Sequence, residues 1–92
     1  IFCNTDQLAC QMRTHLKHRG IRVPEDVQLI GFDGIRDFTS GKPVCSTIVQ
    51  PIEQMAQMAV DVLLSSDSSR TSALINLPVR YESGGTTVDA EE

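Results

Sequence analysis

The feature that most constrains this chain is a short, almost continuous apolar run over residues 27–32, which has the length of one β-strand. Gly20 marks the end of a preceding helix, and a polar turn at Pro24 separates that helix from the run. A strand this apolar is typical of a parallel sheet that helices cover on both faces. Asp33 follows the run directly, and in open sheets of this kind ligands bind outside the carboxyl ends of the strands. We therefore predict that Asp33 points into a small-molecule pocket, with acceptance of hydrogen bonds from loop amides as its alternative role.

The residues before this run predict a helix over about residues 5–19. Residues 1–3 have the character of a buried strand, and Asn4, Thr5 and Asp6 can each accept a hydrogen bond from the first turn of a helix. Basic residues gather near the far end, where the helix dipole favours cations, and Gly20 can adopt the left-handed conformation that ends a helix. The apolar residues recur at three- and four-residue spacing, as one helix face requires: Leu8, Ala9, Met12 and Leu16.

The second half of the chain predicts another strand and another helix. Residues 44–49 are rich in β-branched side chains, which favour a strand. Pro51 suits the first position of a helix over about residues 51–64, and this makes Gln50 the predicted cap. A polar linker at residues 65–72 precedes an extended segment over 73–77 and 79–81, which Pro78 restricts to a sheet edge or splits. We place the domain at residues 1–83 and expect residues 84–92 to form a flexible tail.

The alternation of strands and helices predicts an α/β fold with a mainly parallel sheet flanked by helices. Thr5, Asp33 and Gln50 each follow the end of a predicted strand. In a parallel sheet these strand ends share one edge, where hydrogen-bonding side chains suit a hydroxyl-rich ligand such as a sugar. We predict these three residues as ligand-binding residues, with helix capping as the alternative role of Thr5 and Gln50.

Charge and cysteine content narrow the class of protein. A formal net charge of −4 and a pI near 5.0 argue against nucleic-acid binding by this segment itself. The three cysteines lack C-x-x-C spacing and predict a reduced, cytosolic setting in which they act as small apolar side chains. No apolar run approaches the roughly 18 residues that a membrane span needs. The chain begins inside an apolar triplet, so we interpret it as a piece of a longer protein.

Few residues support catalysis or metal binding. His15 and His18 stand three residues apart and could share a metal, but a histidine near a helix C-terminus is commonly solvated. Cys3 lies in a predicted buried strand and has no base in a recognisable motif. Glu25 and Asp26 fit a polar turn better than a catalytic carboxylate pair. We therefore expect no catalytic residue, no metal and no cofactor, and an enzyme fragment is the poorest hypothesis.

Four blocks of the chain resemble the C-terminal part of lac/gal-repressor family transcription regulators. They read I-F-C-N-T-D-Q-L-A, R-G-I-R-V-P-E-D-V-Q-L-I-G-F-D-G, S-T-I-V-Q-P-I-E-Q-M-A and L-P-V-R-Y, in the family's order and spacing, and they extend to Tyr81. The resemblance implies part of a periplasmic-binding-protein-like (type I) effector-binding core, in which two α/β subdomains surround a ligand cleft. It also implies a helix-turn-helix DNA-binding domain N-terminal to this segment, and an effector that changes operator affinity.

The resemblance also implies roles for single residues. By position, Asp33 matches a carboxylate that hydrogen-bonds effector hydroxyls, and Gln50 matches a polar residue at a crossover between subdomains. Thr5 stands where many members have Asn, so this chain departs from the family there. Asp6 matches the Asp of the family's N-D motif, and helix capping is its alternative role.

The expected parent protein is a cytoplasmic homodimer that binds a sugar or phosphosugar effector, without membrane attachment. The alternative is a periplasmic or extracellular sugar-binding protein of a transport system, which shares the fold. Without its upstream partners the segment would expose the apolar stripe of its second helix and would oligomerise, exchange or unfold; that stripe comprises Ile52, Met55, Ala56, Ala59 and Leu63. The resemblance places the following residues at the dimer interface: Leu8, Ala9, Cys10, Met12 and residues 40–42.

Overall fold

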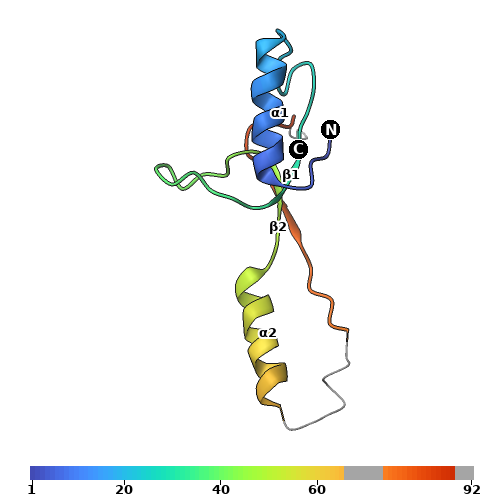
Figure 1. Cartoon of the computed structure of the whole chain (residues 1–92), viewed down its shortest axis with the longest axis vertical. Helices are drawn as coiled ribbons and strands as arrows, with labels where there is room; N and C mark the ends of the chain where they lie inside the picture. The colour runs from blue at the N-terminus through green and yellow to red at the C-terminus, as the bar shows by residue number, and fades with distance from the viewer. Residues whose placement is uncertain (66–73, 89–92) are drawn as a thin grey trace. The chain divides into compact units, whose positions relative to one another are not determined.

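The computed structural model describes residues 1–65 and 74–88 and divides the chain into two compact units. The first unit comprises Ile1–Val49 and Arg80–Glu92, and the second comprises Gln50–Val79. Figure 1 labels the helices and strands, which follow the chain in this order: α1 (Asp6–His18), β1 (Gly31–Asp33), β2 (Thr47–Val49), α2 (Ile52–Leu64) and β3 (Arg80–Glu82).

Helix α1 begins and ends close to the predicted residues because both ends carry local signals. Thr5 is the N-cap in extended conformation, and its Oγ1 accepts a 3.1 Å hydrogen bond from the N–H of Leu8. Such a cap contributes about 1 kcal/mol. At the other end Gly20 has a φ of +75°, its N–H donates to the carbonyl of Lys17, and the N–H of Ile21 donates to the carbonyl of Leu16. This pair of bonds is a Schellman motif, as the glycine predicts.

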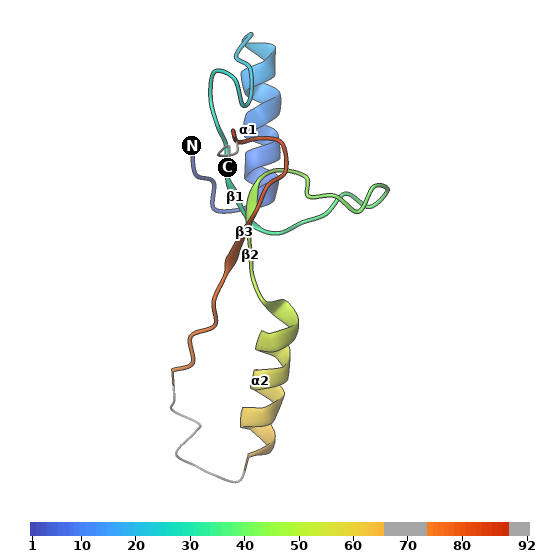
Figure 2. The same ribbon diagram turned by 180° about the vertical axis from the view of Figure 1, so that it is seen from behind.

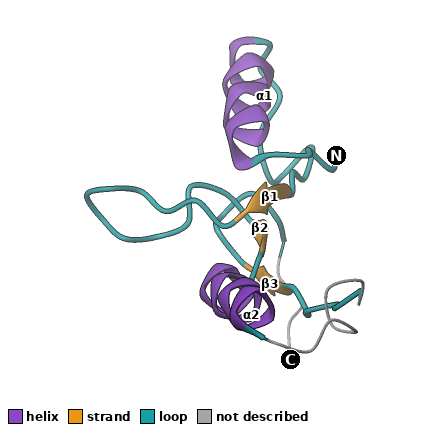
Figure 3. Cartoon of the chain, turned by 60° about the horizontal axis from the view of Figure 1, so that its bottom comes forward, coloured by secondary structure: helices purple, strands orange, loops and turns teal. Residues whose placement is uncertain are grey.

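The sheet of the first unit is mixed, with the order β1-β2-β3 (Figure 3). β1 and β2 are parallel, with Phe32 opposite Ile48, and Phe2 forms a further parallel bridge with Ile30. These pairings confirm the predicted α/β class with parallel strands. β3 is antiparallel to β2, with Ile48 opposite Tyr81, so parallel pairing does not extend to the last strand.

The strands are shorter than the sequence predicts. β1 covers only the end of the apolar run and β2 only the second half of residues 44–49. The amides just before β1 do not bond to β2. The N–H of Ile30 donates to the carbonyl of Ile1, and the N–H of Leu29 donates to the carbonyl of Thr86. β3 begins only after Pro78, which has no N–H to donate, and Ala73 of the predicted last strand lies outside the described residues.

Residues 84–88 do not form the flexible tail that their composition predicts. Thr86 is fully buried. Its Oγ1 accepts a hydrogen bond from the N–H of Ser46 at 2.8 Å and donates one to the carbonyl of Leu29 at 2.7 Å. Gly84 lies so close to the carbonyl of Cys45 that a Cβ would collide with it. A threonine hydroxyl therefore replaces strand-to-strand bonds here; residues 89–92 lie outside the described part.

The apolar core of the first unit is small. Cys3, Ala9 and Cys45 are buried together with Val44 packed against them, and Leu29 is buried as well. All three cysteines are free thiols, and two of them serve as small apolar side chains, as predicted. Phe32 in β1 is only half-buried, so the strand is less completely covered than the apolar run suggests.

Helix α2 of the second unit buries none of its residues. The predicted stripe of Ile52, Met55, Ala56, Ala59 and Leu63 is exposed along its whole length, as expected for this segment. Pro51 occupies the cap position, and no side chain caps the helix, so the prediction that Gln50 caps α2 is wrong. The backbone carbonyl of Gln50 accepts from the N–H of Ile52 instead. Within residues 1–65 and 74–88, no helix has the length and apolar character to cross a membrane.

Candidate functional site

The parallel strands of the first unit bring Thr5 and Asp33 to the same edge of the sheet. Phe2 and Ile30 are bridge partners in parallel strands, and Thr5 and Asp33 each lie three residues further along their strands. The two residues therefore occupy equivalent places at the carboxyl ends of neighbouring strands. Gln50 directly follows β2 and begins the second unit. The structure thus brings together two of the three predicted ligand-binding residues within one unit.

Asp33 ends β1 in an unusual backbone conformation. Its φ is +124°, and it is the only residue other than glycine with positive φ in the described part of the chain. Gly34 follows with a φ of +84°, and a Cβ at this position would lie 3.0 Å from the side chain of Val49. A non-glycine residue in such a region costs on the order of 1–3 kcal/mol, and conformations of this kind gather at ligand sites. The observed strain is therefore an argument for a binding role of Asp33.

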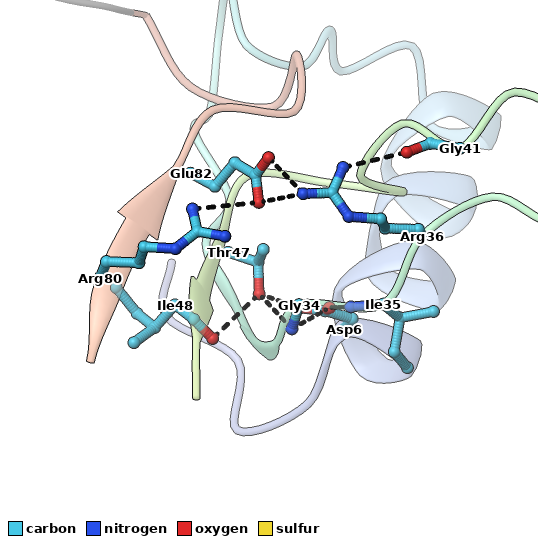
Figure 4. Close-up of polar contacts among 9 residues, drawn as sticks. All are labelled: Asp6, Gly34, Ile35, Arg36, Gly41, Thr47, Ile48, Arg80 and Glu82. Atoms are coloured by element: carbon cyan, nitrogen blue, oxygen red, sulfur yellow. Dashed lines mark hydrogen bonds and ion pairs between the residues drawn. The ribbon is translucent and has the colours of Figure 1, made fainter. Parts of the chain in front are cut away.

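Asp6 is a fully buried carboxylate that holds the loop after β1 (Figure 4). Its Oδ2 accepts from the N–H of Gly34 at 3.0 Å and from the N–H of Ile35 at 2.6 Å. Its Oδ1 accepts from the hydroxyl of Thr47 at 2.6 Å. Hydrogen bonds to a charged group contribute about 1.5–3 kcal/mol each, which is enough to offset the strain at Asp33. Capping of α1, the alternative role predicted for Asp6, belongs to Thr5 instead.

Two neighbours make room for Asp6 and complete its contacts. Gly31 lies so close to Asp6 that a Cβ would collide with Oδ1 and crowd the Cα atom. The hydroxyl of Thr47 donates to Asp6 and also accepts from the N–H of Gly34 at 3.1 Å. Among the described residues, every buried side-chain nitrogen or oxygen has a hydrogen-bond partner. The cluster of Asp6, Gly31 and Thr47 is therefore a closed, fully bonded support under the loop.

Cys45 borders this cluster and is chemically quiet. Its Sγ lies 3.5 Å from Oδ1 of Asp6. Burial, followed by the negative charge of Asp6, raises the pKa of the Cys45 thiol to about 12. The thiol therefore stays protonated at neutral pH and cannot act as a nucleophile there.

The connection between β1 and β2 is a hairpin, which we call the arm (residues 35–44). It extends away from α1 and the sheet of the first unit (Figures 1 and 2). Arg36 and Pro43 form an antiparallel bridge, and the N–H of Val44 donates to the carbonyl of Ile35. Phe38 at the tip is fully exposed. The turn-forming composition of this stretch predicts a loop, but pairing of its two sides was not predicted.

Side-chain contacts organise the arm at its tip and at its base. At the tip, amide hydrogen bonds from Ser40 and Thr39 hold the pKa of Asp37 below its usual range. At the base, the Arg36 guanidinium binds Glu82 of β3 and donates to the carbonyl of Gly41 (Figure 4). Sequence reasoning missed the contact between Arg36 and Glu82 because the two residues lie forty-six positions apart in the chain.

Other predicted positions have different outcomes. Ala9 lies in the core, so the prediction that it faces a second copy of the chain is wrong, whereas Leu8 is exposed and Cys10 half-buried. His15 and His18 are both exposed on α1. Among residues 1–65 and 74–88, no group of three or more His, Cys, Asp or Glu side chains is placed to hold a metal ion.

Comparisons with known proteins agree with this geometry. A model of the periplasmic binding protein-like domain matches residues 1–87. Catabolite control protein A of Priestia megaterium is 33% identical over 84 residues, which cover 89% of this chain and 25% of that protein. The HTH-type transcriptional repressor PurR of Photorhabdus laumondii is 39% identical over 64 residues, which cover 70% of this chain and 19% of that protein.

A solved structure gives the same result for the fold. The lac repressor dimer bound to operator and the anti-inducer ONPF matches with a TM-score of 0.78 and 27% identity, over 96% of this chain and 31% of that one. The chain belongs to the periplasmic binding protein-like domain family, and its relatives confirm the resemblance to lac/gal-type transcription regulators. It spans about a quarter of the length of catabolite control protein A.

Proposed function

We propose that this chain is the C-terminal part of the effector-binding core of a DNA-binding transcriptional repressor that responds to a sugar or phosphosugar. The observation that carries the proposal is Asp33, which stands at the carboxyl end of a parallel strand with a strained backbone. The kinds of relative that the chain matches support the same role.

The three predicted ligand residues would share the work of binding. The carboxylate of Asp33 accepts hydrogen bonds from effector hydroxyls, which select a polyol over an apolar ligand. Gln50 contributes an amide that both donates and accepts. Thr5 contributes through its hydroxyl proton, because its oxygen already accepts from Leu8 at the start of α1.

The mechanism would be a shift of population between two arrangements of the core. An effector that prefers one arrangement biases the attached DNA-binding domains, and by linkage operator DNA biases effector affinity equally. We place the DNA-binding domain N-terminal to this chain and expect a cytoplasmic homodimer without catalytic activity. The chain's own charge of −4 agrees with DNA contacts that lie elsewhere in the protein.

A periplasmic or extracellular sugar-binding protein of a transport system is the second candidate, because it would share the fold. The relatives named above favour the repressor, since two of them are repressors by name. A helix-turn-helix segment upstream would support the repressor, and a secretory signal peptide would support the transport protein.

A calorimetric screen of the intact protein against monosaccharides and their phosphates tests the role of Asp33. The variant Asp33→Ala should lose at least about tenfold in affinity, which corresponds to one charge-assisted hydrogen bond. Asp61→Ala, which removes an exposed carboxylate from α2, is the matched control and should bind as the wild type does. Equal affinity of Asp33→Ala and wild type would remove Asp33 from the site.

A further inference from the structure

Asp6 lies beside the candidate site but cannot touch a ligand, because its side chain is fully buried. Its contacts are all internal: two loop amides, the Thr47 hydroxyl and the Cys45 thiol. A buried carboxylate usually has such partners, so burial alone does not indicate a role for Asp6. The position of the two amides in the loop after β1 does indicate one.

The first of these amides belongs to the peptide group that joins Asp33 to Gly34. Its N–H is shared between Oδ2 of Asp6 at 3.0 Å and Oγ1 of Thr47 at 3.1 Å. The next amide, of Ile35, donates to the same Oδ2 at 2.6 Å. On its other side, Asp33 is held in the ladder opposite Val49. The backbone of Asp33 is therefore fixed on both sides, by the strand before it and by the hydrogen-bonded peptide after it.

Asp6 also connects the two predicted contacts of the first unit. It is the first residue of α1 and directly follows Thr5, the N-cap. One carboxylate thus joins the start of the helix that carries Thr5 to the loop that carries Asp33. Movement of one of these segments against the other would break bonds to Asp6.

We propose that Asp6 is a positioning residue that orients Asp33, and sets its spacing from Thr5, so that both are preorganised for the effector. The proposal deepens the binding role of Asp33 and rests on it. Thr47 assists by holding the carboxylate and the Gly34 amide together. Preorganisation raises affinity because the ligand does not have to order the loop when it binds.

The test uses the intact protein and five variants: Asp6→Asn, Asp33→Ala, the double variant, and the pair Thr47→Val and Thr47→Ser as a rescue comparison. The probe is whichever of D-ribose, D-glucose, D-fructose and their phosphates binds the wild type in calorimetry. Asp6→Asn should weaken binding roughly tenfold, because the neutral amide offers one acceptor atom in place of two. Thr47→Val should weaken binding as well, whereas Thr47→Ser, which keeps the hydroxyl, should restore wild-type affinity.

The double variant distinguishes positioning from general damage. If Asp6 acts through Asp33, Asp6→Asn should add little to the loss already caused by Asp33→Ala. Independent additive losses would overturn the positioning role and leave the role of Asp33 intact. Unchanged affinity in Asp33→Ala alone would instead reject the proposed contact of Asp33.

Hydrogen exchange at the Gly34 and Ile35 amides supplies a readout that needs no effector. In folded Asp6→Asn, both amides should exchange at least about tenfold faster while the amides of α2 keep their rates. Unchanged protection of these two amides would overturn the proposal. If Asp6→Asn does not fold, Thr47→Val against Thr47→Ser provides the same comparison.

Discussion

The guanidinium of Arg36 binds both carboxylate oxygens of Glu82, at 2.6 Å and 2.8 Å, and so joins the base of the arm to β3. Arg80, two residues earlier in β3, lies 3.4 Å from the same carboxylate. The contact is partly exposed, with about half of the Arg36 side chain accessible, so solvent screens it. Both bonds from Arg36 to Glu82 come from Nη2, while Nη1 donates to the carbonyl of Gly41, so one guanidinium contacts β3 and the far side of the arm at the same time.

Replacing Arg36 should therefore loosen the arm more than it destabilises the protein. Arg36→Lys should cost at most about 1 kcal/mol of unfolding free energy, because a single ammonium replaces the two guanidinium nitrogens that bond Glu82 and the carbonyl of Gly41. The measurement is chemical denaturation at low and high salt, with Arg80→Lys as the control. An equal loss in the two variants would contradict a special role of the Arg36 guanidinium.

Two glycines should respond to alanine for different reasons. Gly31→Ala should cost up to about 3 kcal/mol, because the new Cβ meets the backbone and carboxylate of Asp6. Gly20→Ala should cost only about 1 kcal/mol, since the space there is open and only the left-handed φ of +75° opposes alanine. Thermal or chemical unfolding compares the stability of the two variants. A similar loss at both positions would show that Asp6 can shift to accommodate the new Cβ.

Thr86→Val should be strongly destabilising although it keeps the shape of the side chain. The change leaves the N–H of Ser46 and the carbonyl of Leu29 without their hydroxyl partner, at a cost of about 2–4 kcal/mol. Thr86→Ser keeps the hydroxyl and serves as the control in chemical denaturation. A stable valine variant would mean that water replaces the hydroxyl in this place.

The tip of the arm should loosen in acid. Amides of Ser40 and Thr39 lower the pKa of Asp37 in the folded chain below its ordinary value of 3.8. The pKa of Asp37 is lower in the folded chain than in the unfolded chain. The Asp37 carboxylate therefore stabilises the folded tip of the arm fully above pH 3.8, and this stabilisation is lost as the pH falls through the pKa of the folded state.

Nuclear magnetic resonance of the Thr39 and Ser40 amides during an acid titration should therefore show loss of their hydrogen bonds below that pH. The matched control is Asp37→Asn, in which the transition should be absent. A wild-type transition well above pH 3.8 would contradict the lowered pKa.

Local signals explain which parts of the fold were predictable from the sequence. Thr5 and Gly20 bracket α1 because capping and left-handed termination depend on neighbouring residues alone. The placement of Asp33 at a parallel strand end followed from one apolar run and its position in the chain. The cap of α2 was predicted wrongly because the helix begins at Ile52, one residue later than expected. Pro51, the expected first helical residue, therefore occupies the cap position.

The missed roles of Asp6 and Thr86 depend on contacts between distant residues. Asp6 meets Thr47 forty-one residues away, and Thr86 meets Leu29 fifty-seven residues away. A segment of short polar residues has the same composition whether it forms a flexible end or bonds a buried backbone. Composition could therefore not distinguish these two roles. The predicted ligand roles of Thr5, Asp33 and Gln50 remain predictions for the calorimetric screen.

The burial of Thr86 has a practical consequence for anyone who redesigns or tags this protein. A cloning boundary drawn at Ser83, where the glycines begin, would delete the hydroxyl that bonds Ser46 and Leu29. Reporter fusions and affinity handles belong after Val88, and a truncation library should treat the glycine pair as structural chain rather than as spare linker.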